Sequence, residues 1–397
     1  MSSSPSQPLA GRRIWIAGIG GAGMSGYALL ARAWGAEVGG WDRVDTPYLR
    51  HLEDVAVEIS PDPPSPPPGW EAYVSTAFAG RVDGRPRAEL LAELVEQRRT
   101  IVVAGAHGKT TTTAMIAFCL GRLGLDPAFL IGADVPQLGG NARAGSGWLV
   151  VEGDESDRSV GALHPEIAVL LNVDLDHHTT FLSRDEVAAF FEDWLRGVPH
   201  VVRAEELGPP DLDLAVPGEH NRRNAAAALA ALELAGVTRR DAESALGEFR
   251  GAGRRLEPKG EARGVTVLDS YAHHPAELAA DLVAVRSGGR LLALFQPHLY
   301  SRTLHLAHGF AEALAGADAA CVTEIYPARE EQLLGVSGRL IVDELARRRP
   351  GMSIGWAPKL EDAARLVAAW ARPGDTVLTL GAGDVDRAAP LILEALT

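Results

Sequence analysis

Short apolar runs recur along this chain, and longer segments with mixed apolar and polar positions separate them. An apolar run at 13–17 and a second one ending at Asp42 flank a segment at 24–34 with helical periodicity. Apolar runs bounded by turn residues predict buried strands, and longer periodic segments predict helices. Because strands that alternate with helices are typical of parallel sheets, we predict an α/β fold.

The same alternation continues to the C-terminus. Further strands are predicted at residues 100–103, 148–151, 166–171, 264–268, 290–295, 319–324, 352–356 and 375–380. Further helices are predicted at residues 88–98, 184–196, 225–235, 275–286, 303–315, 337–348, 360–371 and 385–396. A chain of 397 residues is long enough for two or three domains, and the elements fall into three segments, at 1–98, 99–253 and 254–397.

The first predicted strand leads into a glycine loop. Gly18, Gly20 and Gly23 satisfy the fingerprint Gly-x-Gly-x-x-Gly, and Asp42 ends the next strand. In this arrangement the glycines allow a tight turn, and a diphosphate binds at the N-terminus of the following helix. The pattern predicts a Rossmann-like domain, but it does not identify the nucleotide and is weak evidence for a dehydrogenase.

A second glycine loop follows the strand at 100–103. Residues 105–112 read Gly-Ala-His-Gly-Lys-Thr-Thr-Thr and precede a helical segment. In a P-loop the backbone amides surround the phosphates, Lys109 reaches the β- and γ-phosphates, and the Thr110 hydroxyl binds Mg²⁺. The strict spacing requires glycine where Val103 stands, so this loop is a shortened variant. We favour a nucleotide site, and a simple glycine turn before a helix is the alternative.

An acidic residue and a histidine follow two of the predicted strands. Glu152 comes directly after the run at 148–151, and His177 follows the run at 166–171. Ligands of open parallel sheets bind beyond the carboxyl ends of the strands, where both residues fall. Mg²⁺ prefers oxygen ligands, so Glu152 is a natural ligand, whereas His177 suits a second metal or a phosphate contact. A solvated strand end and a loop histidine are the alternatives.

Other polar residues form candidate ligand contacts in the second half of the chain. Asn221 and Asn224 lie on one face at the start of a helix, where their amides can cap the helix or contact adenine. Arg254 and Arg255 can reach a polyphosphate or remain solvated. Four histidines gather near strand ends of the third segment, namely His273, His274, His298 and His305. Few cysteines or acidic residues stand nearby at ligand spacing, so we expect substrate contacts rather than a zinc site.

Composition restricts the partners and the compartment. The formal net charge of −14 argues against nucleic acid or an anionic membrane as the main partner. Cys119 and Cys321 are expected to be buried free thiols in a reducing compartment. No apolar run approaches the length of a membrane span, and the N-terminus lacks the basic start and apolar core of a signal peptide. We expect a cytoplasmic monomer or homodimer.

Motifs distributed over nearly the whole chain occur in the order found in the Mur ligases, and the chain resembles that family. The matching segments lie at residues 18–26, 105–112, 152–157, 174–177, 217–224, 253–255, 269–275, 295–298, 325–328 and 381–384. The pattern is most similar to that of the family members that add L-alanine to UDP-N-acetylmuramate.

The resemblance implies a Rossmann-like UDP-substrate domain, a central P-loop ATPase domain and a Rossmann-like C-terminal domain for the amino acid. It implies that ATP phosphorylates the muramate carboxylate to an acyl phosphate, which the amine attacks with release of phosphate. Mg²⁺ and Lys109 would offset the charge of the transferred phosphoryl group. The implied catalytic residues are Lys109, Glu152, His177 and Arg255.

The resemblance also implies the residues that bind each ligand. ATP is expected to contact Gly105, His107, Gly108, Lys109, Thr110, Thr111, Asn221, Asn224 and Arg255. The metal is expected to contact Thr110, Glu152 and His177. The substrates are expected to contact Gly18, Gly20, Gly21, Ala22, Gly23, Met24, Ser25, Asp42, Tyr271, His273, His298 and Arg302. Of these residues, those of the first glycine loop are expected to hold the UDP diphosphate. His273, His298 and Arg302 are expected to face the amino acid.

The chain departs from the family pattern at a few positions. Leu299 stands where the family has an arginine close to the amino-acid carboxylate, so Arg302 would hold that carboxylate more weakly than a pair would. The stretches at 78–87 and 195–217 are shorter than in the family. Two alternatives remain open: a ligase that attaches a recycled peptide to UDP-N-acetylmuramate, and a catalytically weakened paralogue that binds nucleotide.

Overall fold

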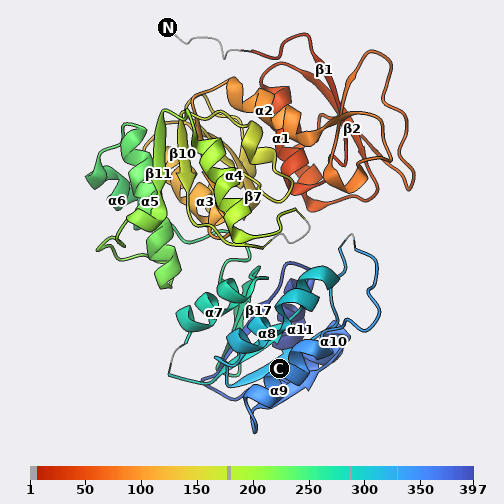
Figure 1. The fold of residues 1–397 in the computed structure, drawn as a ribbon, viewed down its shortest axis with the longest axis vertical. Helices are drawn as coiled ribbons and strands as arrows, with labels where there is room; N and C mark the ends of the chain where they lie inside the picture. The colour runs from red at the N-terminus through yellow and green to blue at the C-terminus, as the bar shows by residue number, and fades with distance from the viewer. Residues whose placement is uncertain (1–6, 177–179, 287, 329) are drawn as a thin grey trace. The chain divides into compact units, whose positions relative to one another are not determined.

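The computed structural model describes residues 7–397 apart from 177–179, 287 and 329 (Figure 1). It contains three sheets, and the chain divides into two compact units. The first unit comprises the chain up to Leu175, Thr180–Leu214 and Arg223–Arg250, and the second comprises the segment that begins at Asp176, Ala215–Arg222 and Gly251–Thr397. The predicted α/β fold is confirmed, and the exact boundaries of three domains stay a prediction.

The first sheet has the strand order β3-β2-β1-β4-β5, and all its pairs are parallel. Its strands are β1 Arg13–Ala17, β2 Glu37–Asp42, β3 Ala56–Ile59, β4 Glu71–Val74 and β5 Arg85–Pro86. Helix α1 (Ala22–Ala33) connects β1 to β2, and α2 (Arg87–Glu96) leads out of the sheet. The order matches the predicted Rossmann-like domain, with the glycine loop at the carboxyl end of β1.

The second sheet has the order β11-β10-β6-β9-β7-β8. Its strands are β6 Thr100–Ala104, β7 Ala128–Val135, β8 Gly140–Arg143, β9 Leu149–Glu152, β10 Ile167–Leu170 and β11 His200–Arg203. Its helices are α3 Lys109–Arg122, α4 Arg184–Leu195, α5 Glu219–Leu234 and α6 Arg239–Leu246. Because β6 lies between β9 and β10, the residues that follow those two strands flank the P-loop.

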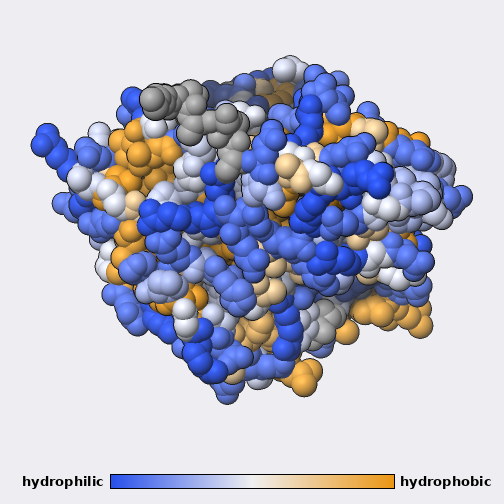
Figure 2. Space-filling view, turned by 90° about the horizontal axis from the view of Figure 1, so that it is seen from above, coloured by the Kyte–Doolittle hydropathy of each residue, from blue (hydrophilic) through white to orange (hydrophobic). Residues whose placement is uncertain are grey.

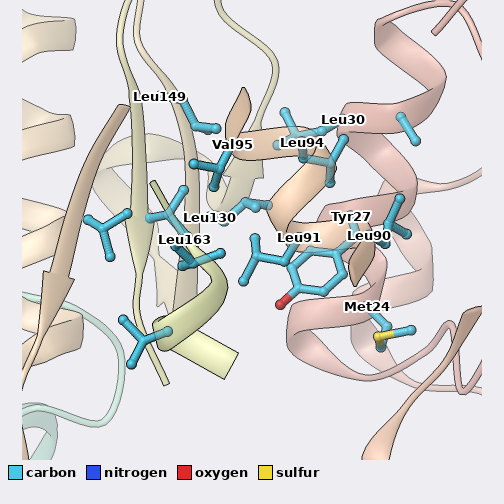
Figure 3. Packing of buried hydrophobic residues seen from close by; sticks show 14 of the residues in the cluster. Met24, Tyr27, Leu30, Leu90, Leu91, Leu94, Val95, Leu130, Leu149 and Leu163 are labelled. Atoms are coloured by element: carbon cyan, nitrogen blue, oxygen red, sulfur yellow. The ribbon is translucent and has the colours of Figure 1, made fainter. Parts of the chain in front are cut away.

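The first two sheets share one hydrophobic core, which Figure 3 shows from close by. Tyr27 and Leu30 of α1 lie beside Leu91 and Leu94 of α2, and Leu130 of β7 approaches from the other side. All five side chains are buried. Burial of apolar area at about 25 cal/mol per Å² makes such a cluster a large contribution to folding. The core therefore fixes the first glycine loop relative to the second sheet.

Gly26 lies at the centre of this contact. A Cβ atom at Gly26 would lie 2.7 Å from Leu130 Cδ2 and 3.1 Å from the Ala142 Cβ of β8. Helix α1 can approach the β7–β8 pair this closely because residue 26 has no side chain.

The third sheet, in the second unit, has the order β12-β13-β17-β14-β15-β16. Its strands are β12 Glu257–Ala262, β13 Val265–Ser270, β14 Leu291–Phe295, β15 Ala319–Val322, β16 Ser353–Trp356 and β17 Thr376–Leu380. Its helices are α7 Pro275–Ala284, α8 Tyr300–Leu314, α9 Arg339–Arg348, α10 Leu360–Trp370 and α11 Ala388–Leu396. Alternate β14 residues pack into two clusters, one with α7, α8 and α9 and one with α10 and α11. Helices therefore cover both faces of the sheet, as predicted.

Several elements were not predicted. They are the strands β3, β4, β5, β7, β8, β11 and β12 and the helix α6. Of these strands, β8 and β12 pair antiparallel at a sheet edge. Helix α5 begins at Glu219 rather than at residue 225, so Asn221 and Asn224 lie inside the helix. Cys119 and Cys321 are buried and free, as predicted, and burial raises the pKa of each thiol to about 12.

The outer surface is mostly polar. Figure 2 shows a face on which hydrophilic residues predominate and hydrophobic residues form small separate patches. Among the described residues, no helix combines the length and the apolar character that crossing a membrane requires.

A buried polar cluster lies beneath α7 in the second unit. Asp281 is 9% exposed and accepts a hydrogen bond from the Ser270 hydroxyl. His220 Nε2 lies 3.6 Å from the other carboxylate oxygen. Burial raises the pKa of Asp281 to about 7, with a further increase from Glu277 and an opposing effect from Arg255.

We expect Gly26→Ala to lower the stability of the first unit, because the added methyl group meets Leu130 and Ala142. Overpacking costs about 1–3 kcal/mol, which exceeds the gain in helix propensity of about 1 kcal/mol. The control is Gly121→Ala in α3, where the nearest atoms lie 4.0 Å from the added Cβ. Thermal unfolding should show a lower midpoint for the first variant and an unchanged or higher one for the second; equal midpoints would contradict the packing argument.

Asp281→Asn should flatten the pH dependence of stability. The folded-state pKa of about 7 exceeds the ordinary 3.8, so between these values the folded protein binds more protons than the unfolded chain, and its stability falls as pH rises. The variant lacks this decrease in the free energy of unfolding, which amounts to at most about 1.4 kcal/mol per pH unit. Unfolding midpoints at pH 5 and 8 should diverge between the two proteins, whereas exposed Asp343→Asn should follow the wild type.

Candidate active site

Hydrogen bonds to the end of β2 and to Thr46 hold the first glycine loop in place. The amides of Gly18 and Ile19 donate to the Trp41 carbonyl. Gly20 donates its N–H to Asp42 Oδ2 at 2.8 Å, and its carbonyl accepts from the Thr46 hydroxyl at 2.6 Å. The protein itself therefore uses both polar groups of Gly20, and Asp42 holds the loop in place.

The free amides of this loop lie at the start of α1. Gly21 is the N-cap residue, and the amides of Ala22, Gly23 and Met24 occupy the first turn, where a helix offers no acceptor. Met24 and Ser25 are 3% exposed, and the Ser25 hydroxyl donates to the Ala22 carbonyl. Amides at the first turn of a helix can bind a diphosphate. The substrate contacts expected of Gly18 and of residues 20–25 stay a prediction.

The second glycine loop is held by the neighbouring strand. Gly105 and Gly108 have φ values of +131° and +86°, which favour glycine. The Asn172 side chain accepts a hydrogen bond from the His107 N–H and donates one to the His107 carbonyl, both at 2.9 Å. His107 Nε2 lies 3.6 Å from a carboxylate oxygen of Asp174. Asn172 lies two residues after the end of β10, so the segment that follows this strand fixes the shape of the loop.

Lys109 begins α3 and its ammonium group is turned into the loop. Its Nζ donates to the carbonyls of Gly105 at 2.6 Å and Ala106 at 3.3 Å. It also lies 3.0 Å from both carboxylate oxygens of Glu155, whose side chain is 3% exposed. Burial opposes the charge on Lys109, but Glu155 and the acidic groups beside it raise the pKa of the ammonium above its ordinary value.

Thr110 and Glu152 meet beside the loop. The Thr110 hydroxyl donates to Glu152 Oε2 at 3.1 Å, and the Gly132 amide donates to Oε1 at 2.6 Å. A hydroxyl and a carboxylate at this separation are the oxygen donors that Mg²⁺ prefers, so the two residues fit the predicted metal site. His177, the third predicted ligand, lies outside the described residues.

The acidic segment after β9 is anchored to α2. Arg87, the first residue of α2, donates to Asp154 Oδ2 at 2.7 Å and to Asp157 Oδ2 at 2.7 and 3.0 Å. Burial opposes the charge, but Arg87 and Lys109 lower the pKa of Asp154 to about 2. Asp154 therefore remains ionised at neutral pH, and hydrogen bonds from Arg87 hold the segment between the two aspartates beside the P-loop.

The predicted adenine contacts have different surroundings. Asn224 packs on the P-loop, because a Cβ at Gly108 would lie 2.4 Å from Asn224 Oδ1. Asn221 donates from Nδ2 to the Pro217 carbonyl at 2.6 Å. Both side chains are buried, at 8% and 6% exposure, and only Asn224 belongs to the unit that contains the P-loop.

The predicted amino-acid residues gather in the second unit. Arg302 is 4% exposed; its Nε donates to Asp176 Oδ1 at 2.9 Å, and its Nη1 lies 3.2 Å from His298 Nδ1. The His298 ring stacks on Tyr326 with centroids 5.8 Å apart and an interplanar angle of 12°. A substrate carboxylate at Arg302 would therefore share the guanidinium with Asp176.

His273 is neutral at physiological pH. Burial lowers its pKa to about 4, because the surroundings disfavour the charged ring. Nδ1 lies 3.0 Å from the Tyr271 carbonyl, an acceptor only, so Nδ1 carries the proton and Nε2 keeps a lone pair. The Tyr271 ring lies under the guanidinium groups of Arg254 and Arg255, each 5.2 Å from its centroid.

The two arginines of this motif differ in their contacts. Arg254 donates to buried Asp269 and to the carbonyls of Gly381 and Gly383, at 2.8–2.9 Å. Arg254 therefore stabilises the sheet. The nucleotide contact expected of Arg255 stays a prediction.

Leu299, the position that departs from the family, is the N-cap residue of α8 and has a φ of +71°. Such a conformation is strained for a leucine, and residues of this kind cluster at functional sites. Its amide donates to the Tyr326 carbonyl, and its own carbonyl accepts from the Thr303 hydroxyl at 2.8 Å.

Sequence reasoning missed three residues that organise the site, namely Arg87, Glu155 and Asn172. Each is a charged or amide side chain beside a motif, and its partner lies on another element. The acidic run at 152–157 carried a signal, because several carboxylates beside one P-loop lysine require further cations or hydrogen-bond donors.

The comparisons with known proteins agree with this geometry. The family described as "Mur ligase middle domain" matches residues 103–202, and "Mur ligase, glutamate ligase domain" matches residues 254–383. The UDP-N-acetylmuramate–L-alanine ligase of Streptomyces avermitilis is 37% identical over 471 aligned positions, covering 99% of this chain and 99% of that protein. The protein of the same name from an Arthrobacter species is 41% identical, with 97% and 95% covered.

A solved structure of a ligase of the same kind is also similar to this chain. The UDP-N-acetylmuramate–alanine ligase of Thermotoga maritima matches with a TM-score of 0.78 and 25% identity, covering 96% of this chain and 98% of that chain. The sequence alignments are longer than the 397 residues of this chain, so these relatives contain residues that it lacks. The chain belongs to the Mur ligase family.

Proposed function

We propose that this protein is an ATP-dependent ligase that joins L-alanine to UDP-N-acetylmuramate and releases ADP and phosphate, a step of peptidoglycan precursor synthesis. The observation that carries the proposal is the grouping of Lys109, Thr110 and Glu152 at one P-loop. A protein that only binds nucleotide does not need this phosphoryl-transfer set. The names of the relatives agree with this activity.

ATP binds with its phosphates in the loop at 105–112. The loop amides and Lys109 surround the phosphates, and Asn224 lies on the loop at Gly108. Thr110, Glu152 and His177 hold Mg²⁺, which offsets phosphate charge and orients the phosphates when it is bound. Because the reaction requires ATP, we place the protein in the cytoplasm.

In the first half-reaction the muramate carboxylate attacks the γ-phosphorus. An oxygen–phosphorus bond forms, the bond to the β-phosphate oxygen breaks, and ADP leaves. Phosphorylation is needed because a carboxylate is a poor acyl donor. Lys109 offsets the charge that develops on the transferred group, as such cations do in phosphoryl transfer.

In the second half-reaction the neutral amine of the amino acid attacks the acyl carbon. A carbon–nitrogen bond forms, the bond to the phosphate oxygen breaks, phosphate leaves, and the nitrogen loses a proton. His273 presents its Nε2 lone pair and can accept a hydrogen bond from the amine. Its low pKa keeps the ring uncharged, so it does not repel an ammonium group. The guanidinium group of Arg302 holds the carboxylate of the amino acid.

The proposal is tested by phosphate release from Mg-ATP in the presence of UDP-N-acetylmuramate. We expect release that depends on both the nucleotide sugar and L-alanine, and a loss of at least about a hundredfold in Lys109→Ala. Glycine, L-serine and a murein tripeptide replace L-alanine in parallel reactions. Release only with the peptide would identify the recycling ligase, and nucleotide binding without any release would identify a weakened paralogue; both outcomes contradict the proposal.

The departure at residue 299 gives a second test. Leu299→Arg places a guanidinium beside the proposed carboxylate site, and a charged hydrogen bond contributes about 1.5–3 kcal/mol. We therefore expect the KM for L-alanine to fall by about tenfold or more, with kcat little changed. Leu299→Met keeps the size and the neutral charge and should leave the KM unchanged. An unchanged KM in the arginine variant would remove residue 299 from the amino-acid site.

A further inference from the structure

The ammonium group of Lys109 has no hydrogen left to offer a phosphate. A lysine ammonium has three N–H donors. Here they point to the Gly105 carbonyl at 2.6 Å, to the Ala106 carbonyl at 3.3 Å, and to the two Glu155 oxygens at 3.0 Å each. A β- or γ-phosphate that binds Lys109 must therefore replace one of these acceptors.

Glu155 is the acceptor that a phosphate replaces. The two carbonyls belong to the loop itself, and they stay near Nζ for as long as the loop keeps its shape. The Glu155 carboxylate is an anion like the phosphate, so both compete for the same cation by the same charge-assisted bonds. Exchange of one anion for another leaves the charge on Lys109 balanced.

The carboxylate cannot follow the lysine when the exchange occurs. Asp154 and Asp157, on either side of Glu155, are held by Arg87. The backbone between them is fixed as well, because Ser156 N–H donates to Asp154 Oδ1 at 2.9 Å. Glu155, with 3% of its side chain exposed, therefore loses a charged partner without gaining water, which is unfavourable.

We propose that Glu155 is a positioning residue of this enzyme, which holds Lys109 inside the P-loop and is exchanged for the nucleotide phosphates on binding. This inference rests on the proposed function, because it requires ATP at the P-loop. It assigns Glu155 a role distinct from that of Glu152, whose oxygens face Thr110 and Gly132. The intrinsic affinity of the loop for nucleotide is then higher than the affinity of the whole protein.

The test is the affinity of Glu155→Gln for the Mg complex of a non-hydrolysable ATP analogue, measured by calorimetry. Glutamine has the size of glutamate but no charge, so Lys109 becomes available and we expect the Kd to fall by about three- to tenfold. Asp154→Asn is the matched control: it removes one negative charge from the adjacent residue, but its carboxylate pairs with Arg87. We expect less than about a twofold decrease in Kd for this control.

Glu155→Asp covers the case in which the glutamine variant does not fold. The aspartate carboxylate is one methylene shorter and is withdrawn from Nζ, so the Kd should fall by a smaller factor. A Kd that is unchanged or higher in the folded Glu155 variants would overturn the inference, and so would an equal decrease in Asp154→Asn, which would indicate a general charge effect. Failure of the wild type to bind the analogue would instead contradict the proposed function.

Discussion

The hydrophobic contact between α1 and the β7–β8 pair is the constraint on which the first unit depends. It joins two sheets, which the sequence pattern assigns to separate segments, into one hydrophobic core. The absence of a side chain at Gly26 permits this contact. Two glycine loops, one at the start of α1 and one at the start of α3, thereby belong to a single compact unit. For a reaction between a nucleotide sugar and ATP, this packing fixes the positions of the two loops that we expect to bind the phosphates.

Charge around the second loop follows from the same parallel architecture. Strands that run in one direction end at one edge, so Glu152, Glu155 and Asn172 arrive beside the P-loop from β9 and β10. Several carboxylates in so small a volume require cations, and Arg87 and Lys109 supply them. Asp154, Asp157 and Glu155 are therefore already paired with cations in the absence of a ligand.

Much of this organisation could be predicted from the sequence, because strands, helices and glycine loops are local patterns. The elements that were predicted, the positions of both loops and the burial of both cysteines agree with the structure, but seven strands and the helix α6 were not predicted. The pairing of Arg87 with Asp154 and of Asn172 with His107 could not be predicted, since it depends on which strands are neighbours. The antiparallel edges formed by β8 and β12 were missed because short polar strands lack a clear apolar run. The left-handed backbone of Leu299 could not be predicted either, because leucine rarely adopts a positive φ and its residue type does not mark the exception.

The position of Asp42 has a consequence for cofactor choice. In dinucleotide-binding domains the acidic residue at the end of the second strand takes the hydroxyl groups of an adenosine ribose. Here its two oxygens accept the Gly20 and Arg43 amides at 2.8 and 2.7 Å, so the carboxylate serves the backbone. The glycine fingerprint is retained, while the acidic residue that follows it accepts hydrogen bonds from backbone amides, so the fingerprint by itself does not identify an NAD site.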